Sequence, residues 1–307
     1  MSRTRRIGLA PFLFLALLPG AGTDASDLRD PSASVPPPRR IVAGDFNADF
    51  QPDVLLETAR GNLVVWLMEG LKPTARVTNP ARRADQGWRA VGTHDFDGDG
   101  NTDILWFHPR NGVLAVWHMD GLNLQYESEL SERFFDAVPV SIFDFNRDNH
   151  PDILFQTTQG ELVVGILVGN DVVEKVRLDL AWQGSRGSLT AIGAADFDQD
   201  GDFDIVLHHR GFSPCEAGSG CTSAARSDLV AVALMNGTRS KIVVVSEQQD
   251  RNWRIGAVSD YDGDSNPDLI WYNTLTHETA AWRMEGLKIR QSLIIVPGAP
   301  GVIVGPR

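Results

Sequence analysis

The sequence predicts an all-β protein, a β-propeller of five blades with four antiparallel strands in each blade. One observation is a nine-residue acidic segment that occurs five times, beginning at Asp45, Asp95, Asp144, Asp196 and Asp260. The other is the text between these segments, where apolar runs of strand length alternate with turn residues and no helical periodicity appears. Self-similarity at a period of about 50 residues is typical of solenoids and propellers.

The second repeat shows the expected order of strands. Residues 88–92 form a first strand that leads into the acidic segment, and the apolar run 104–107 forms a second. Residues 108–112 contain Pro and Gly and predict a turn. A third strand covers 113–119 and, after a tight Asp-Gly turn, a fourth covers 122–130, where apolar and polar residues alternate. The other repeats follow the same order.

Radial packing of these units is favoured because a single four-stranded sheet cannot bury both of its apolar faces. A linear array of sheets would leave large apolar surfaces in water, whereas a ring covers them. The expected propeller occupies residues 40–307, with repeats that start near residues 40, 88, 137, 189 and 253. Residues 301–305 resemble the start of a further first strand, which we expect to help close the ring against the first blade.

Three tryptophans, Trp66, Trp117 and Trp282, occupy the same position of the third strand in their repeats. Aromatic side chains at a fixed register either pack between blades or stack on sugars. Because the third strand is expected to be buried, packing between blades is the favoured interpretation.

Residues 1–39 bear on the cellular compartment of the protein. Residues 1–25 combine a basic start, an apolar run too short to span a bilayer and small residues near Ala25, which predicts a signal peptide; an uncleaved anchor is the alternative. Residues 26–39 are rich in Pro and Ser and predict a linker. We therefore expect an exported protein, periplasmic or secreted, with no membrane span after signal cleavage.

The net charge bears on the class of partner, and the cysteine content bears on the compartment. The formal net charge is −12 and no basic stripe is present, which argues against a nucleic-acid partner. The two cysteines, Cys215 and Cys221, are close in sequence, and an oxidising compartment would favour a disulfide between them over two free thiols.

The acidic segments indicate a cation site. In the second repeat, carboxylates stand at positions 1, 3, 5 and 9 of the segment. Two carboxylates about 5 Å apart repel by roughly 3 kcal/mol at an effective dielectric constant near 20, so a folded loop of this kind favours a neutralising ion. Alternating Asp side chains suit Ca²⁺, which takes six to eight oxygen ligands. An Asp-rich turn without metal is the alternative, and an EF-hand is excluded because position 12 is apolar or aromatic in every repeat.

These segments resemble the FG-GAP / VCBS repeats of integrin alpha-chain propellers and of secreted bacterial proteins. The resemblance rests on DFDGDGNTDILW, DFDQDGDFDIVL and DYDGDSNPDLIW, and it covers about residues 40–296. It implies a calcium-binding propeller and up to five Ca²⁺ ions. The ligands that it implies are Asp45, Asn47, Asp49 and Asp53; Asp95, Asp97, Asp99, Asp103 and the Asn101 carbonyl; Asp144, Asn146, Asp148 and Asp152; Asp196, Asp198, Asp200, Asp204 and the Asp202 carbonyl; and Asp260, Asp262, Asp264, Asp268 and the Asn266 carbonyl.

The first of these sites is expected to be the weakest or empty. Its sixth position holds Phe50 where the resemblance calls for Gly, and a bulky side chain strains a left-handed turn. In the third repeat Asn149 stands at this position, and Asn tolerates the left-handed conformation.

Ligand binding is expected on the face opposite the metals, because antiparallel strands place alternate loops at opposite ends. That face should carry the loops between the second and third strands, including a single large insertion at residues 208–227. The candidate ligand-contacting residues are Phe107, His108, Arg110, His208, His209, Arg210, Tyr272 and His277. Each histidine taken singly is also compatible with an ordinary solvated loop residue.

The predicted function is a calcium-stabilised binding or adhesion module for a glycan or an extracellular protein. The sequence contains no nucleophile elbow, no zinc-protease motif and no phosphate loop. The alternative is a carbohydrate-active enzyme, a glycoside hydrolase or lyase, since two placed carboxylates would suffice for that chemistry. A structural module without a ligand of its own is the third possibility.

Overall fold

The computed structural model describes residues 40–57, 62–82, 87–180, 189–212, 227–248, 250 and 252–296. Contacts divide the chain into two units, Met1–Ser34 and Val35–Arg307, and all described residues belong to the second. The predicted signal peptide, the linker, both cysteines and residues 301–305 lie outside the described ranges. Within them, no helix is long and apolar enough to cross a membrane.

Twenty strands form five antiparallel sheets of four, as the sequence predicts. The strands are, blade by blade, β1 Arg40–Gly44, β2 Asp53–Glu57, β3 Asn62–Glu69, β4 Lys72–Arg82; β5 Arg89–His94, β6 Asp103–His108, β7 Val113–Asp120, β8 Asn123–Arg133; β9 Ala137–Phe143, β10 Asp152–Thr157, β11 Leu162–Val168, β12 Asp171–Leu178; β13 Leu189–Ala195, β14 Asp204–Phe212, β15 Ser227–Asn236, β16 Arg239–Gln248; and β17 Trp253–Ser259, β18 Asp268–Asn273, β19 Thr279–Glu285, β20 Lys288–Val296.

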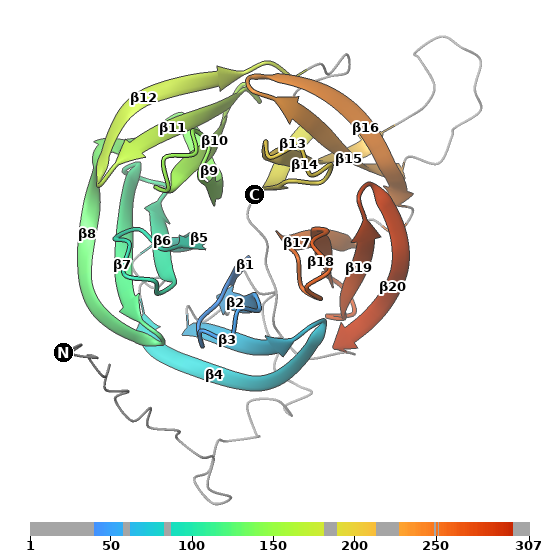
Figure 1. Ribbon diagram of the computed structural model, residues 1–307, viewed down its shortest axis with the longest axis horizontal. Helices are drawn as coiled ribbons and strands as arrows, with labels where there is room; N and C mark the ends of the chain where they lie inside the picture. Colours follow the sequence, from blue (N-terminus) through green and yellow to red (C-terminus); the bar gives the residue numbers. More distant parts are fainter. Residues whose placement is uncertain are drawn as a thin grey trace, which may run out of the picture. The chain divides into compact units, whose positions relative to one another are not determined.

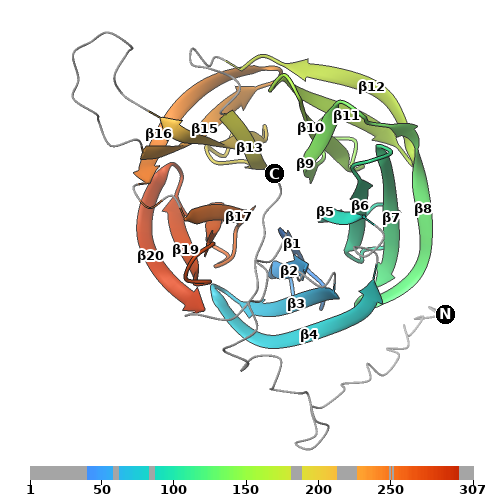
Figure 2. The same ribbon diagram turned by 180° about the vertical axis from the view of Figure 1, so that it is seen from behind.

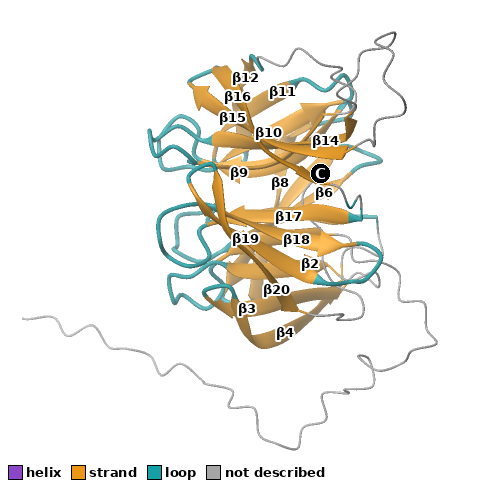
Figure 3. Cartoon of the chain, turned by 90° about the vertical axis from the view of Figure 1, so that its right-hand side faces the viewer, coloured by secondary structure: helices purple, strands orange, loops and turns teal. Residues whose placement is uncertain are grey.

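The five sheets stand around one axis as the blades of a propeller (Figures 1 and 2). In each blade the strands pair in sequence order, so the first strand lies nearest the axis and the fourth lies at the rim. The innermost strands β1, β5, β9, β13 and β17 each contact the next one around the ring. The loops collect at the two ends of the strands, which form the two faces of the propeller (Figure 3).

The inner strands of the blades are buried on both faces of the sheet, and strand β6 shows how the sequence achieves this. Ile104 and Trp106 pack into the core shared with the first blade, whereas Leu105 and Phe107 pack into the core shared with the third. Successive side chains of a strand point to opposite faces. A central strand that is covered on both sides therefore reads as a continuous apolar run.

The ring closes through the same kind of core that joins the other blades. Val54 and Trp66 of the first blade pack in one buried cluster with Tyr261 and Ile270 of the fifth blade. In the described residues this closure involves no exchange of strands, because each sheet takes its four strands from one stretch of chain. The side chains between β1–β4 and β17–β20 therefore hold the ring together at this point.

The three aligned tryptophans pack between blades. Trp66, Trp117 and Trp282 are 6%, 4% and 8% exposed. Trp117 lies against Trp106 with ring centroids 4.7 Å apart, and Trp282 lies against Trp271 at 4.4 Å. The packing interpretation is confirmed for these side chains.

Candidate metal sites on the acidic loops

The acidic loops lie between the first and second strands of each blade and share one face with the turns between the third and fourth strands. Side chains at position 7 of three loops accept hydrogen bonds from the glycine of the neighbouring turn: Gly70 N–H to Gln51 Oε1 (2.7 Å), Gly237 N–H to Asp202 Oδ2 (2.8 Å) and Gly286 N–H to Asn266 Oδ1 (2.9 Å). The expected pairing of loops on one face is thus present.

The last aspartate of each loop is fully buried and works as a bridge between backbone amides. Asp204 shows the pattern: its Oδ2 accepts from the Phe197 N–H and its Oδ1 from the Met235 N–H, both at 2.8 Å. The same two bonds recur at Asp53, Asp103, Asp152 and Asp268. Position 9 therefore ties the loop to the third strand whether or not a metal is bound.

Burial also changes the acidity of these aspartates. Loss of hydration raises the pKa of Asp53 and of Asp204 to about 6 and that of Asp268 to about 7, although the amide hydrogen bonds oppose the change. Burial likewise raises the pKa of Asp103 and Asp152. A cation beside these carboxylates would favour their ionised form.

The first aspartate of each loop sets the shape of the turn. Its Oδ2 accepts from the N–H at position 6, as Asp95 does from Gly100 at 2.8 Å, and the other four loops repeat this bond. Positions 4 and 6 are left-handed throughout, with φ between 58° and 91°. Phe50 adopts φ 67° and is 96% exposed, so the strain expected for the first loop is present in its backbone.

Three loops bring carboxylates together closely enough to hold an ion. In the second, fourth and fifth repeats the ligand oxygens of each group lie within 4.8 Å of one another; the groups are Asp95, Asp97 and Asp99; Asp196, Asp198 and Asp204; and Asp260, Asp262 and Asp268. Asp196 Oδ1 is buried and makes no hydrogen bond. Hard oxygen ligands at this density fit Ca²⁺.

The first and third loops carry Asn instead of Asp at position 3. Asn47 Nδ2 donates to Asp49 Oδ2 and Asn146 Nδ2 donates to Asp148 Oδ2, both at 2.9 Å. The amide of position 3 thus relieves part of the charge that Asp would add. These two loops offer fewer carboxylates, with Asp45, Asp49 and Asp53 in the first and Asp144, Asp148 and Asp152 in the third.

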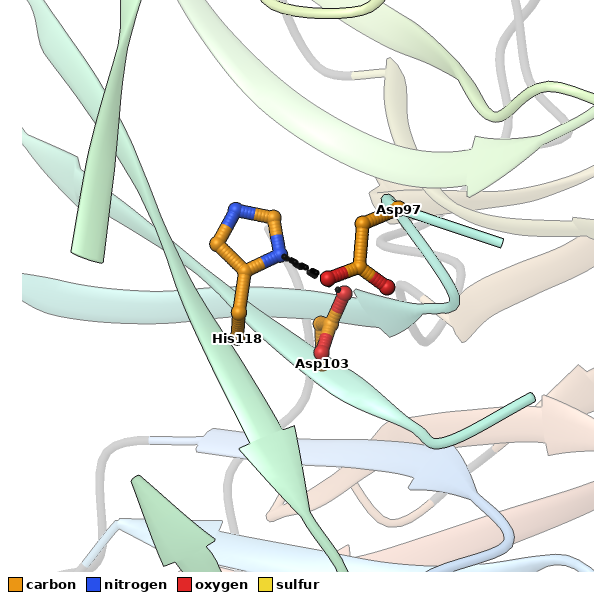
Figure 4. A group of neighbouring side chains, drawn as sticks. All are labelled: Asp97, Asp103 and His118. Carbon is orange, nitrogen blue, oxygen red and sulfur yellow. Dashed lines mark ion pairs between the residues drawn. The ribbon is translucent and has the colours of Figure 1, made fainter. Parts of the chain in front are cut away.

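Two further side chains reach the loops from the third strand, and the sequence reasoning did not single them out. His118 Nδ1 lies 3.3 Å from Asp97 Oδ2 and 3.2 Å from Asp103 Oδ2 (Figure 4). At the same position of the fifth blade, Arg283 forms ion pairs with Asp262 and Asp264. The signal was available in the sequence, because both residues stand directly after the aligned tryptophan.

The candidates for the opposite face divide by burial. Phe107, His208, His209 and Tyr272 are buried, His108 and His277 are half-buried, and Arg110 and Arg210 are exposed. Tyr272 shares a hydrogen bond of 2.9 Å with His277, and His108 packs edge-on against Trp88. A ligand on this face would therefore meet the two arginines before it met the buried rings.

The insertion in the fourth repeat starts later than the sequence suggested. His208, His209 and Arg210 belong to β14, where His208 pairs with Val230 and His209 with Leu229. The hairpin is longer than in the other blades because Phe212 still pairs with Ser227. Residues 213–226, which include both cysteines, lie outside the described ranges.

Comparison with known proteins supports the repeat assignment. A family model described as an FG-GAP-like repeat matches residues 45–106 and 95–155. T-cell immunomodulatory protein of Mus musculus is 30% identical over 183 residues, which are 54% of this chain and 29% of that protein. The Rattus norvegicus and Homo sapiens proteins of that name are each 29% identical, over 42% and 41% of this chain and 22% of their own length. The chain thus spans less than a third of these relatives.

Among solved structures, one titled "Structure of Dos1 propeller" aligns with 88% of this chain and 68% of its own, at a TM-score of 0.35 and 8% identity. The five four-stranded blades show a β-propeller fold, and residues 45–155 of this propeller match FG-GAP-like repeats.

Proposed function

We propose that the protein is an exported propeller whose acidic loops bind Ca²⁺ and whose other face binds a glycan or an extracellular protein. One observation carries the metal part: three loops gather carboxylate oxygens within 4.8 Å of one another, on a backbone scaffold that all five repeats share. Bound ions would relieve the repulsion in these loops and stiffen the face on which they lie.

The proposal of a ligand rests on the difference between the two faces of the propeller. The loop face is occupied by hydrogen bonds within and between acidic loops, such as Thr102 Oγ1 to the Asp45 carbonyl (2.7 Å) and Gln199 Nε2 to the Ser265 carbonyl (3.1 Å). The opposite face carries the exposed Arg110 and Arg210 and the long β14–β15 hairpin. Functional contacts commonly sit on loops that a rigid scaffold presents.

Calcium can be tested by thermal unfolding. A site held at 100 times its dissociation constant adds about 2.7 kcal/mol to stability, so excess EDTA is expected to lower Tm by several degrees per occupied site. Re-addition of Ca²⁺, but not of Na⁺ at equal ionic strength, should restore the parent Tm. An unchanged Tm in EDTA would contradict the calcium proposal.

The ligand class is tested by a glycan array probed with the calcium-loaded protein, together with an assay for polysaccharide cleavage. Arg110→Ala and Arg210→Ala are expected to weaken capture of a bound glycan, while Arg76→Ala on the rim serves as a matched control. Product formation from a bound polysaccharide would instead establish the glycosidase or lyase alternative.

A further inference from the structure

His118 presents an imidazole nitrogen to a pair of carboxylates, at ion-pair distance from both of them. The histidine is 5% exposed, and its Nδ1 makes no hydrogen bond although it lies within 3.3 Å of Asp97 Oδ2 and Asp103 Oδ2. Figure 4 shows the ring of His118, from β7, directed at both carboxylates. A buried polar atom that faces a cluster of ligand atoms and has no hydrogen-bond partner requires an explanation.

The surroundings of the ring hold it in this orientation. His118 Nε2 shares a hydrogen bond of 2.9 Å with Ser128 Oγ, and the ring stacks on Tyr126 with centroids 4.2 Å apart. The Tyr126 hydroxyl in turn donates to Asp97 Oδ2 at 2.8 Å. When Nε2 carries the proton and donates to Ser128, Nδ1 turns a lone pair toward two carboxylates, an arrangement that favours a shared cation. In most metal sites, a hydrogen bond of the ring nitrogen that does not bind the metal fixes the orientation of the histidine, as the bond from Nε2 to Ser128 does here.

We propose that Asp97 and Asp103, which the sequence assigns to a Ca²⁺ site, form with His118 a binding site for a borderline divalent cation of the Zn²⁺ class, so that the second loop differs from the all-oxygen calcium groups of the fourth and fifth loops. Ca²⁺ selects oxygen ligands, whereas Zn²⁺ binds imidazole nitrogen and carboxylate oxygen in tetrahedral sites. Two ligand atoms at Zn²⁺ bonding distance and tetrahedral angle lie about 3.3 Å apart. The two measured nitrogen–oxygen separations match this value. The inference rests on the proposed function in one respect, that the acidic loops bind divalent cations.

The other blades supply an internal comparison, because the residue after the aligned tryptophan position differs in each. It is Leu67 in the first blade, Ile166 in the third, Leu234 in the fourth and Arg283 in the fifth. Apolar side chains add no ligand, and the Arg283 guanidinium already neutralises Asp262 and Asp264. Among the five equivalent positions, His118 is the one that adds a nitrogen ligand.

The chain itself provides matched variants for a test. His118→Leu gives the second blade the residue of the first and fourth, and Leu234→His adds an imidazole beside Asp198 and Asp204 in the fourth. Metal-stripped full-length parent and variants would be titrated with Zn²⁺ in excess Ca²⁺ by calorimetry, and with Co²⁺ by visible absorption. We expect His118→Leu to weaken the tightest Zn²⁺ site at least about tenfold and to abolish its Co²⁺ band. Leu234→His should gain a second site.

Two controls keep the result interpretable. The titrations would be repeated with Cys215→Ser and Cys221→Ser, since thiols also bind Zn²⁺, and circular dichroism would show that each variant keeps its sheet content. Equal Zn²⁺ affinity in the parent and in His118→Leu would overturn the inference. If His118→Leu failed to fold, His118→Gln, which keeps a polar side chain but has no imidazole nitrogen, would take its place, and Zn²⁺ affinity equal to that of the parent would overturn the inference as well. Ca²⁺ binding by the fourth and fifth loops, measured in the same samples, tests the proposed function separately.

Discussion

At the scale of single residues, the buried aspartate at the end of each acidic loop combines two tasks that are usually separate. Its two oxygens accept backbone N–H groups from the loop and from the third strand, and in the second, fourth and fifth loops the same carboxylate belongs to a group that could hold an ion. The loop backbone is therefore organised before a cation arrives. Substitution at this position tests the structural task, provided that metal is excluded.

Asp204→Ala is expected to destabilise the metal-free protein by about 2–6 kcal/mol, because it leaves the Phe197 and Met235 amides buried without acceptors at about 1–3 kcal/mol each. Asp200→Ala, in the same loop but exposed, is the control and should cost no more than about 1 kcal/mol. Urea unfolding in EDTA measures both. Equal losses for the two variants would show that Asp204 matters only as a ligand.

Phe50 offers the opposite experiment, a substitution that relieves strain. A non-glycine residue in the left-handed region costs roughly 1–2 kcal/mol, and the 96% exposed ring loses almost no packing on removal. Phe50→Gly is therefore expected to raise stability by about 0.5–1 kcal/mol after the entropy of the unfolded glycine is counted, and to strengthen calcium binding by the first loop. Gly100→Ala, at the equivalent position of the second loop, should lower both. A lower Tm for Phe50→Gly in EDTA would contradict the strain argument.

At the scale of elements, two pairs of neighbouring innermost strands pack closely because a glycine of one strand contacts a side chain of the next blade. A Cβ placed on Gly92 would lie 2.2 Å from Ile142 Cδ1, and one on Gly193 would lie 3.0 Å from Val258 Cγ2. These positions lie three residues before the acidic loop, where the blades converge. Adjacent sheets approach closely there because one of them has no side chain.

Gly92→Ala is expected to cost about 1–3 kcal/mol through overpacking against Ile142. Ile142→Ala alone should also destabilise, because it leaves a small cavity at the same contact. The double variant should be more stable than the sum of the two losses predicts, and a double-mutant cycle by urea unfolding measures the difference. Strict additivity would mean that the two residues do not share one contact.

The strands and their order were predictable from sequence, because apolar runs such as 104–107 and the repeated turns leave few alternatives. The closure of the ring was not predictable from sequence. It depends on which side chains of the first and fifth blades contact each other, and Trp66 and Tyr261 are two that do. The acidic ligand candidates come from the resemblance to FG-GAP repeats together with the spacing of the carboxylates, and they stay predictions. His118 was missed because it approaches the loop across the sheet from β7, and only its place directly after the aligned tryptophan, outside the acidic segment, points to it in the sequence.

At the scale of the whole molecule, the buried carboxylates lie on one face of the propeller. Their ionisation is expected to change the stability with pH in one direction in metal-free protein and in the opposite direction when a cation is bound. In metal-free protein the folded pKa values of Asp53, Asp204 and Asp268, about 6, 6 and 7, lie above the ordinary value of 3.8. The folded state then binds more protons than the unfolded state between pH 4 and 7. The contribution of these groups to the free energy of unfolding therefore decreases as pH rises. Bound Ca²⁺ requires ionised carboxylates and gives the opposite sign.

We expect this contrast to appear when the parent is compared with Asp268→Asn, which resembles the protonated acid. In EDTA the parent should lose stability relative to Asp268→Asn as pH rises from 4 to 7. In excess Ca²⁺ the parent should gain stability relative to the variant over the same range. Urea unfolding at each pH measures the difference, and it cancels the titration of the histidines, which both proteins share. The same slope in EDTA and in Ca²⁺ would contradict metal binding at Asp268.

Because every described sheet is drawn from one uninterrupted stretch of chain, the molecule is modular in an evolutionary sense. Duplication or deletion of a segment of about 50 residues adds or removes a whole blade and leaves no strand without partners. The place of the chain ends in the ring is also expected to be interchangeable, since β1 and β17 contact each other as the other neighbouring innermost strands do. A gene cut between any two blades and rejoined at its old ends would encode the same ring from a new starting point.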